Sequence, residues 1–366
     1  MAHGTEPGLL HLRGLTPGQI AANWSDLPLD LRLARRLTNR VVNQYRDDID
    51  DVPGLSRRAV SALRARASLS RLRVLERRAS AVDPFVKYLF ESTDGARVEA
   101  VRIPLEQPRF SVCVSSQDGC ALGCRFCATG RSGWRRNLAA WEMVEQVLAI
   151  RSEAIERPVT GVVFQGQGEP LLNYDNVLAA IDVLREPCGG RIGGDRITIS
   201  TVGIPHAIER YTDEGHPYRL ILSLTSAFDS RRAALIPTGR SYPVAELAQA
   251  MRRQARTHGR LVHVAWVLIA GLNSGPDEAE ELSRLFPDTP LRVSLIDVND
   301  PTGEFQPAAD DERRRFVSAL AERGIGFVRR YSGGADIHAA CGMLAACTQG
   351  GRPLGETPGP AAESLA

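Results

Sequence analysis

The segment Cys120-Ala-Leu-Gly-Cys124-Arg-Phe-Cys127 is the most informative stretch of this 366-residue chain. Its C-x3-C-x2-C spacing places three thiols close enough together to bind one inorganic centre. Iron–sulfur clusters are held by cysteine thiolates, and a four-iron cluster usually takes four of them. Three ligands leave one iron open to a small molecule. The alternative is a structural zinc site with Cys113 as fourth ligand, although zinc sites tend to pair C-x2-C units.

The composition is that of an intracellular enzyme. A chain of 366 residues can hold one large domain and a smaller one. Its 7 cysteines, an odd number with three of them clustered, do not fit a secreted disulfide framework. No segment approaches the ~18 apolar residues of a membrane helix, and residues 1–30 lack the basic start and apolar core of a signal peptide. We therefore expect a cytoplasmic protein that does not associate with membranes.

Positive charge is concentrated near the start of the chain. The whole sequence has a net charge of +2, but residues 31–80 contain 13 Arg against 5 Asp or Glu, a net charge of +8. Clustered arginines favour contacts with phosphate groups, so RNA is the expected partner of this segment. The alternative is that a GC-rich genome inflates arginine use throughout, because Lys87 is the only lysine in the chain.

Two smaller parts are expected to precede the main domain. Residues 1–80 are predicted to form a helical, arginine-rich accessory domain that contacts RNA, because apolar residues such as Leu31, Leu37 and Val41 recur near helical period. Residues 81–108 are predicted to form a connecting β-hairpin, with strands at 84–90 and 97–103. The turn of this hairpin is Thr93-Asp94-Gly95.

Residues 109–345 are predicted to form an α/β core in which strands and helices alternate. The expected strands are 109–115, 160–164, 196–201, 218–224, 261–269, 291–297 and 326–330. The expected helices are 141–154, 176–185, 243–257 and 308–322. Such alternation builds a parallel sheet with helices outside, which predicts a partial or full β/α barrel with ligands at the C-terminal strand ends. Residues 346–366, rich in Gly, Pro and Ala, are expected to be a disordered tail.

Polar residues follow several of these predicted strands. Gly166-Gln167-Gly168-Glu169-Pro170 follows the second core strand, where glycines let the backbone approach a ligand closely and Glu169 offers acceptors for an ammonium group. Ser200 ends the third strand, Ser223 ends the fourth with Thr225 just beyond it, and Asn299 lies past the sixth. Each residue alone could be an ordinary cap of a strand end. Their recurrence at successive strand ends predicts one shared ligand site.

Two further cysteines are candidates for chemistry. Cys113 lies within the first core strand, seven residues before Cys120. Cys341 follows the last predicted strand, in a loop bordered by glycines, where a thiolate can act as a nucleophile toward a sulfonium methyl group. Free cysteines are often small buried apolar residues, which is our interpretation of Cys188 and Cys347.

Taken together, these segments resemble the RlmN/Cfr family of radical-SAM RNA adenine methyltransferases, from about residue 84 to residue 345. The matching segments are Val98-Glu99-Ala100-Val101-Arg102-Ile103-Pro104, Cys113-Val114-Ser115-Ser116-Gln117, Gly119 to Cys127, Gly168-Glu169-Pro170-Leu171-Leu172-Asn173, Ile199-Ser200-Thr201 and Asp336-Ile337-His338-Ala339-Ala340-Cys341-Gly342. The resemblance implies a radical-SAM barrel and a [4Fe–4S] cluster held by Cys120, Cys124 and Cys127. It also implies S-adenosylmethionine (SAM) bound to the open iron and to Gly168, Glu169, Ser200, Ser223, Thr225 and Asn299.

The resemblance further implies a mechanism that uses two SAM per turnover. One SAM methylates the sulfur of Cys341, and the second is cleaved reductively to a 5′-deoxyadenosyl radical, which removes hydrogen from that methyl group. The carbon radical adds to the adenine ring, and Glu99 accepts the ring proton. Cys113 then attacks the Cys341 sulfur, which releases methyladenosine and leaves a Cys113–Cys341 disulfide.

The same resemblance implies large-subunit ribosomal RNA, and transfer RNA, as substrates of a monomeric enzyme. An electron donor such as flavodoxin or ferredoxin is also implied. Methylation of adenine carbon 2 is our preferred interpretation, and methylation of carbon 8, which protects ribosomes from antibiotics, is the alternative. A third interpretation is a non-catalytic iron–sulfur protein that binds RNA or senses redox state. The Cys113/Cys341 pair argues against it, because binding alone would need neither cysteine.

The chain departs from the family pattern at three places near the expected SAM site. Thr225 stands where the family usually has histidine, and Gln167 stands where it usually has methionine. Val298-Asn299-Asp300 replaces the usual tryptophan-asparagine-proline. The cluster cysteines and both reactive cysteines are kept, so these departures bear on the RNA target more than on the type of reaction.

Overall fold

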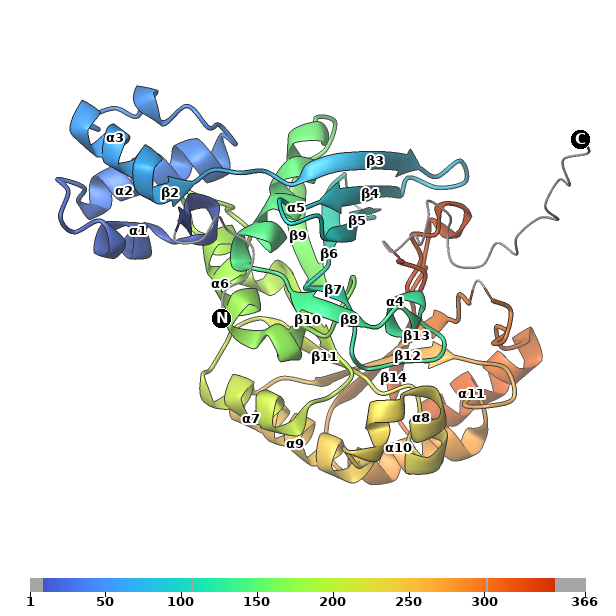
Figure 1. The fold of residues 1–366 in the computed structure, drawn as a ribbon. Helices are drawn as coiled ribbons and strands as arrows, with labels where there is room; N and C mark the ends of the chain where they lie inside the picture. Colours follow the sequence, from blue (N-terminus) through green and yellow to red (C-terminus); the bar gives the residue numbers. More distant parts are fainter. Residues whose placement is uncertain (1–8, 107, 301, 346–366) are drawn as a thin grey trace, which may run out of the picture.

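A single ten-stranded sheet dominates the computed structural model, which describes residues 9–106, 108–300 and 302–345 (Figure 1). The strand order is β14-β13-β12-β11-β10-β9-β6-β5-β4-β3. Seven of these strands are mutually parallel: β6 (Phe110–Val114), β9 (Val159–Phe164), β10 (Ile197–Thr201), β11 (Arg219–Ser223), β12 (Val262–Leu268), β13 (Leu291–Asp297) and β14 (Gly326–Arg329). Each corresponds to one of the predicted core strands. The order does not close on itself, so the sheet is a partial barrel.

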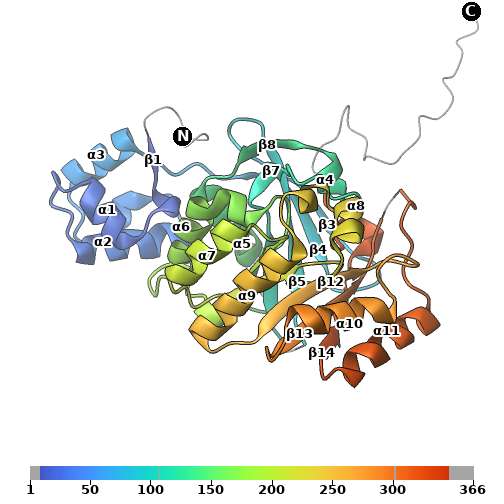
Figure 2. The same cartoon turned by 90° about the horizontal axis from the view of Figure 1, so that it is seen from below.

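Helices cover the outer face of the parallel strands (Figure 2). They are α5 (Ala140–Glu153), α6 (Tyr174–Arg185), α7 (Pro205–Asp213), α9 (Val244–His258), α10 (Pro276–Leu285) and α11 (Asp310–Glu322), with the shorter α8 (Asp229–Leu235) near the sheet's C-terminal edge. The four predicted core helices are confirmed. Within the described ranges, no helix has the length and apolar character needed to cross a membrane.

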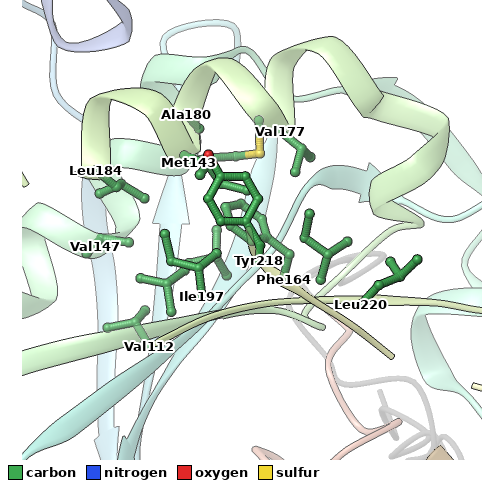
Figure 3. Close-up of a cluster of buried hydrophobic side chains, with 14 of the residues drawn as sticks. Val112, Met143, Val147, Phe164, Val177, Ala180, Leu184, Ile197, Tyr218 and Leu220 are labelled. Carbon is green, nitrogen blue, oxygen red and sulfur yellow. The ribbon is translucent and has the colours of Figure 1, made fainter. Parts of the chain in front are cut away.

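The main core lies between these helices and the sheet (Figure 3). Met143 and Val147 of α5 and Val177 of α6 face strand residues such as Phe164 and Leu220, and all of these side chains are buried. Parallel strands are buried on both faces, which is why they consist of nearly continuous apolar residues. This core fixes the strand ends at which the candidate site residues lie.

The predicted hairpin forms an antiparallel extension of the sheet. Its strands are β4 (Val86–Glu91) and β5 (Arg97–Pro104), and β5 pairs with β6. In this register Lys87 lies opposite Val101, which lies opposite Cys113. Side chains alternate between faces along a strand, so Glu99 shares the face of Val101. The hairpin thus places Lys87, Glu99 and Cys113 on one face of the sheet.

The N-terminal part contains the helices α1 (Pro17–Asn23), α2 (Leu31–Thr38) and α3 (Arg57–Arg66), and the short paired strands β1 (Leu10–His11) and β2 (Ala67–Ser68). It docks on α5. The His11 ring stacks on Trp141 with ring centres 4.1 Å apart, and Arg13 forms an ion pair of 3.1 Å with Glu145. Both Arg13 and Glu145 are fully buried, so this contact is part of the protein interior.

The helical segment predicted over residues 1–80 ends earlier than expected. Helix α3 ends at Arg66, and Arg73–Ala79 forms β3, an edge strand antiparallel to β4. Its three arginines are exposed, which is common at a sheet edge because charged side chains discourage pairing with other chains. The β4 backbone needs a second partner for its N–H and C=O groups, and β3 provides it. The predicted tail, 346–366, lies outside the described residues.

Candidate active site

One cavity at the C-terminal ends of the parallel strands brings most of the predicted site residues together. Its volume is about 190 Å³, several times the ~30 Å³ that one water molecule occupies. Ten predicted residues line it: Cys113, Cys120, Cys124, Cys127, Gly168, Glu169, Ser200, Ser223, Asn299 and Cys341. The structure therefore brings these predicted residues to one cavity.

The three clustered cysteines lie in the loop between β7 (Gln117–Gly119) and α4 (Ala128–Arg131). The Cys120 N–H donates to the Gly133 carbonyl at 2.8 Å, and the Cys127 N–H donates to the Cys124 carbonyl at 3.1 Å. Apolar side chains surround the loop, among them Leu122, Phe126, Leu235, Ile236 and Phe305. Burial raises the pKa of Cys120 to about 12 and also raises the pKa of Cys124 and of Cys127.

This arrangement fits a cluster better than a single metal ion. Across the parts of the chain that the structure describes, no three or more Cys, His, Asp or Glu side chains converge as the ligands of one ion would. In a four-iron cluster each thiolate binds a different iron, so the sulfurs need not meet at one point. Three thiols in an apolar cavity wall satisfy that requirement, and binding would replace their protons with iron.

The Gly166–Pro170 segment forms the wall beside the cysteines. Gly168 has a φ of +95°, and an added Cβ there would lie 2.5 Å from the Gln117 Cβ, so only glycine fits. The Glu169 Oε1 accepts the Leu171 N–H at 3.0 Å, and Oε2 accepts the Val202 N–H at 2.9 Å. These bonds aim a buried carboxylate at the cavity, where burial raises its pKa.

The loop after β14 places Cys341 against the cysteine loop. The Gly342 carbonyl accepts the Ala128 N–H at 2.7 Å, and the Leu344 carbonyl accepts the Thr129 hydroxyl at 2.6 Å. The Cys341 N–H donates to the Ser332 hydroxyl at 2.8 Å. Gly342 has a φ of +86°, which lets the chain turn at this close approach. A segment distant in sequence thereby joins the cavity.

Gln165 contacts both Cys113 and Cys341, and no sequence pattern singled it out. Its side-chain Nε2 lies 3.9 Å from the Cys341 sulfur, and its backbone forms a hydrogen bond with the Cys113 thiol. Burial, and next the charge of Cys341, raises the pKa of Cys113 to about 12. All six described cysteines are free, so no Cys113–Cys341 disulfide is present in this state. A protonated Cys113 is a poor nucleophile, which disfavours premature disulfide formation.

Glu99 lies behind the Cys341 loop and does not line the cavity. It is only 5 % exposed, so it is not a surface strand residue. Its Oε1 pairs with the Lys87 Nζ at 2.9 Å, and its Oε2 accepts the Ala345 N–H at 2.7 Å. Lys87 also donates to the His338 carbonyl at 3.4 Å. The pair therefore fastens the Cys341 loop at both ends. Lys87 was not predicted as a site residue. That it is the only lysine in the chain is a sequence feature that could have pointed to it.

Two of the family departures lie away from the cavity. Thr225 is fully buried, and its φ of +66° turns the chain away from the cavity after β11, where Asn273 Nδ2 donates to the Thr225 carbonyl at 2.6 Å. The Gln167 side chain is directed toward β5, and its Oε1 accepts the Glu99 N–H at 2.9 Å. Gln167 therefore supports the strand that carries Glu99.

Comparison with known proteins explains this combination of residues. Residues 114–286 match the Radical SAM superfamily. A "Probable RNA methyltransferase" of Myxococcus xanthus is 44% identical over 345 residues, which is 93% of this chain and 96% of the relative. A "Probable dual-specificity RNA methyltransferase RlmN" of Heliobacterium modesticaldum is 39% identical over 355 residues, 93% of this chain and 90% of the relative. The chain belongs to the RlmN-type radical-SAM RNA methyltransferases.

A solved structure supports the same assignment. The radical SAM methyltransferase from Sphaerobacter thermophilus matches with a TM-score of 0.86 and 36% identity, over 92% of this chain and 99% of that one. Membership of the radical-SAM family implies a [4Fe–4S] cluster and SAM as cofactors, and the names of the relatives support RNA as the substrate. The cysteine loop, Glu169 and Cys341 line the same cavity of this methyltransferase.

Proposed function

We propose that this radical-SAM enzyme methylates carbon 2 of an adenine in large-subunit ribosomal RNA, and in transfer RNA, through an S-methyl group on Cys341. The observation that carries the proposal is that Cys113 and Cys341 line the same cavity as the three clustered cysteines. A protein that only bound RNA would not need this pair. Carbon 2 is preferred over carbon 8 because the named relatives include RlmN proteins.

Cys120, Cys124 and Cys127 are the proposed ligands of the cluster, and SAM would contact Gly168, Glu169, Ser200, Ser223 and Asn299. These bound groups supply a methyl group and, with an electron from a donor such as flavodoxin or ferredoxin, a 5′-deoxyadenosyl radical. Glu169 is suited to the SAM ammonium group, because its two oxygens are already aimed by backbone N–H groups and can accept further hydrogen bonds. Thr225 does not line the cavity, so its predicted contact with SAM stays a prediction.

Three residues of the chain then perform the proposed transfer. Cys341 carries the methyl group and becomes bonded through that carbon to the adenine ring. Glu99 accepts the ring proton, which requires its bond from the Ala345 N–H to open when RNA enters. Cys113 attacks the Cys341 sulfur, so the S–C bond breaks, the carbon keeps the electron pair and gains a proton, and the two sulfurs become a disulfide.

RNA contact is proposed for the N-terminal part. Arg32, Arg35, Arg36 and Arg40 line one groove along α2. Arg36 and Arg40 are held by Pro53, Asp48 and Asp51, whereas Arg32 and Arg35 are exposed. Guanidinium groups that face solvent in a row fit an RNA backbone. The target adenine must leave its stack to reach the enclosed Cys341, so we expect a looped or pre-opened base.

The decisive experiment separates Cys341 from Cys113. Cys341→Ala is expected to give no methylated RNA. Cys113→Ala should still acquire the methyl group and add to RNA, and should then stall as a covalent conjugate through Cys341, because no thiol remains to attack the sulfur. Cys188→Ala is the matched control, because Cys188 is a half-buried cysteine outside the cavity. Cys188 lines the arginine groove, so its variant can bind RNA with a different affinity, but it should form no covalent conjugate.

The readouts are recovery of protein-bound RNA and mass analysis of nucleosides for 2-methyladenosine. Full turnover by Cys113→Ala, or conjugates from the Cys113→Ala/Cys341→Ala double variant, would overturn the division of roles. Recovery of 8-methyladenosine would move the assignment to carbon 8. We further propose that the enzyme is monomeric and acts in the cytoplasm, where cysteines such as the six free thiols described here remain reduced.

A further inference from the structure

Among the described residues, two arginines are almost completely buried, and their surroundings differ. Arg13 is 0 % exposed and Arg232 is 1 % exposed. Arg13 is paired with two carboxylates, those of Asp47 and Glu145. Arg232, on α8, has no carboxylate within 4.0 Å anywhere in the described ranges. One buried guanidinium is thus compensated and the other is not.

Arg232 is held in place by a single hydrogen bond. Its Nη2 donates to the Val202 carbonyl at 2.5 Å, while Nε and Nη1 are buried without a partner. No other side chain in the described part of the chain has two such unpartnered nitrogens. An added Cβ on Gly239 would lie 2.8 Å from Nη1, so the guanidinium is also tightly enclosed.

An uncompensated buried charge is expensive, with an effective penalty of several kcal/mol per ion after relaxation of the surroundings. No ion pair in the described ranges therefore neutralises the Arg232 guanidinium. Burial lowers the pKa of Arg232, and the neighbouring Cys124 and Asp229 oppose that shift, Cys124 more strongly. Asp229 accepts the Val244 N–H at 2.7 Å and forms no ion pair with Arg232 within 4.0 Å. Val202, whose carbonyl accepts from Arg232, packs against the buried group that contains Cys120 and Cys124, so the guanidinium lies on the side of the cysteine loop.

We propose that Arg232 is the electrostatic partner of the iron–sulfur cluster, buried behind Cys124 and Val202 to balance the negative charge of the ligated centre. Three thiolates outweigh the positive charge of an oxidised four-iron core, and reduction adds another electron. A fixed cation in a low-dielectric wall stabilises the reduced state more than the oxidised one, so it raises the reduction potential. Arg232 does not line the cavity, so it is a positioning residue that acts through the wall.

The hydrogen bond to Val202 extends this role toward the SAM side of the cavity. The same Val202 residue that accepts from Arg232 donates its N–H to the Glu169 carboxylate. Val202 therefore links the Arg232 guanidinium to the Glu169 carboxylate, which is the proposed acceptor for the SAM ammonium group. The inference rests on the proposed ligation by Cys120, Cys124 and Cys127.

The test removes the charge and keeps the hydrogen bond. Arg232→Gln retains a donor for the Val202 carbonyl but is neutral, and Arg232→Lys retains the positive charge. The matched control is Arg231→Gln, because Arg231 is its neighbour on α8 but pairs with Asp277 and Glu278. Each full-length protein is reconstituted anaerobically with iron and sulfide, and the cluster is titrated against potential with detection by electron paramagnetic resonance.

At a fixed potential, Arg232→Gln is expected to lower the ratio of reduced to oxidised cluster at least tenfold, which is 59 mV for a one-electron couple. Arg232→Lys should stay within about threefold of the wild type, and Arg231→Gln should not differ from it. Thermal unfolding gives a second readout. Reconstitution should stabilise the wild type more than Arg232→Gln, because only the wild type gains a counter-charge for a buried cation.

A merely structural Arg232 would give a different pattern. Arg232→Gln would then lose the same stability with and without the cluster, and its potential would match the wild type, which would overturn this inference alone. A wild-type protein that holds no four-iron cluster would overturn the proposed function together with it. The iron and sulfide content of the wild type distinguishes the two failures.

Discussion

The hydrogen bond from the Thr129 hydroxyl to the Leu344 carbonyl is expected to hold the Cys341 loop closed. Thr129 is buried at 3 % exposure, and Thr129→Val keeps its shape while removing the donor. The Leu344 carbonyl, in a residue only 6 % exposed, loses its partner. Leaving one buried acceptor unpaired costs about 1–3 kcal/mol. At about 1.36 kcal/mol per tenfold change, the open population of the loop should rise about 5- to 150-fold.

Two measurements on cluster-free protein would detect this opening. Hydrogen exchange of peptides covering residues 336–345 should accelerate, and alkylation of Cys341, followed by peptide mass mapping, should accelerate by the same factor. Cluster-free protein is used because the Thr129 hydroxyl also interacts with the Cys127 thiol. The matched control is Thr160→Val on β9, whose buried hydroxyl has no hydrogen-bond partner to lose.

The reasoning is refuted by either of two results. Equal exchange and alkylation rates in Thr129→Val and Thr160→Val would show that the bond does not hold the loop. Faster exchange throughout the protein, with no excess in residues 336–345, would show that the substitution acts on global stability instead.

Three further predictions concern the hairpin, the N-terminal dock and the arginine groove. Lys87→Met leaves Glu99 buried without its cation and should lower the free energy of unfolding by about 3–5 kcal/mol. Lys87→Met/Glu99→Leu should recover most of that loss. Equal losses for the single and double variants in denaturant unfolding would contradict this reasoning. Burial lowers the pKa of His11 from 6.5 to about 3, so its stabilising share is present above pH 6.5 and is lost as the pH falls, by about 2 kcal/mol near pH 5. His11→Gln should therefore flatten the acid side of the stability–pH curve, and an unchanged slope would argue against a neutral buried imidazole. Arg32→Ala/Arg35→Ala should weaken RNA binding and reduce the dependence of log affinity on log salt concentration by about 1.4, or ~0.7 per phosphate contact. The control is the double alanine variant of the exposed Arg284 on α10 and Arg315 on α11, which should change neither quantity.

The sequence predicted the parallel core well because its signals are local. A run such as Val262–Leu268 is apolar apart from His263, as expected for a strand largely buried on both faces, and glycines or polar residues mark its ends. Ser200, Ser223 and Asn299 reach one cavity because parallel strands end at the same edge. Neither inference needed knowledge of contacts between distant segments.

The missed features depend on distant contacts. Strand β3 reads as Arg-Val-Leu-Glu-Arg-Arg-Ala, without regular alternation, and becomes a strand because β4 lies beside it. Thr225 was expected at the cavity from its position after β11, but its positive φ and the Asn273 side chain take it elsewhere. Arg232 has no ion pair because no carboxylate from any other described segment lies beside it, and a local sequence pattern cannot show this.

The position of the only lysine has a practical consequence for studying this enzyme. A lysine-specific protease has a single target in the whole chain, the bond between Lys87 and Tyr88. Both residues lie in β4, which is hydrogen-bonded to β3 on one side and to β5 on the other. The bond can be cut only after the hairpin separates, and one cut divides the arginine-rich segment from every cysteine in the chain. The rate of that single cleavage therefore measures how often β4, the strand that contains Lys87, separates from the sheet.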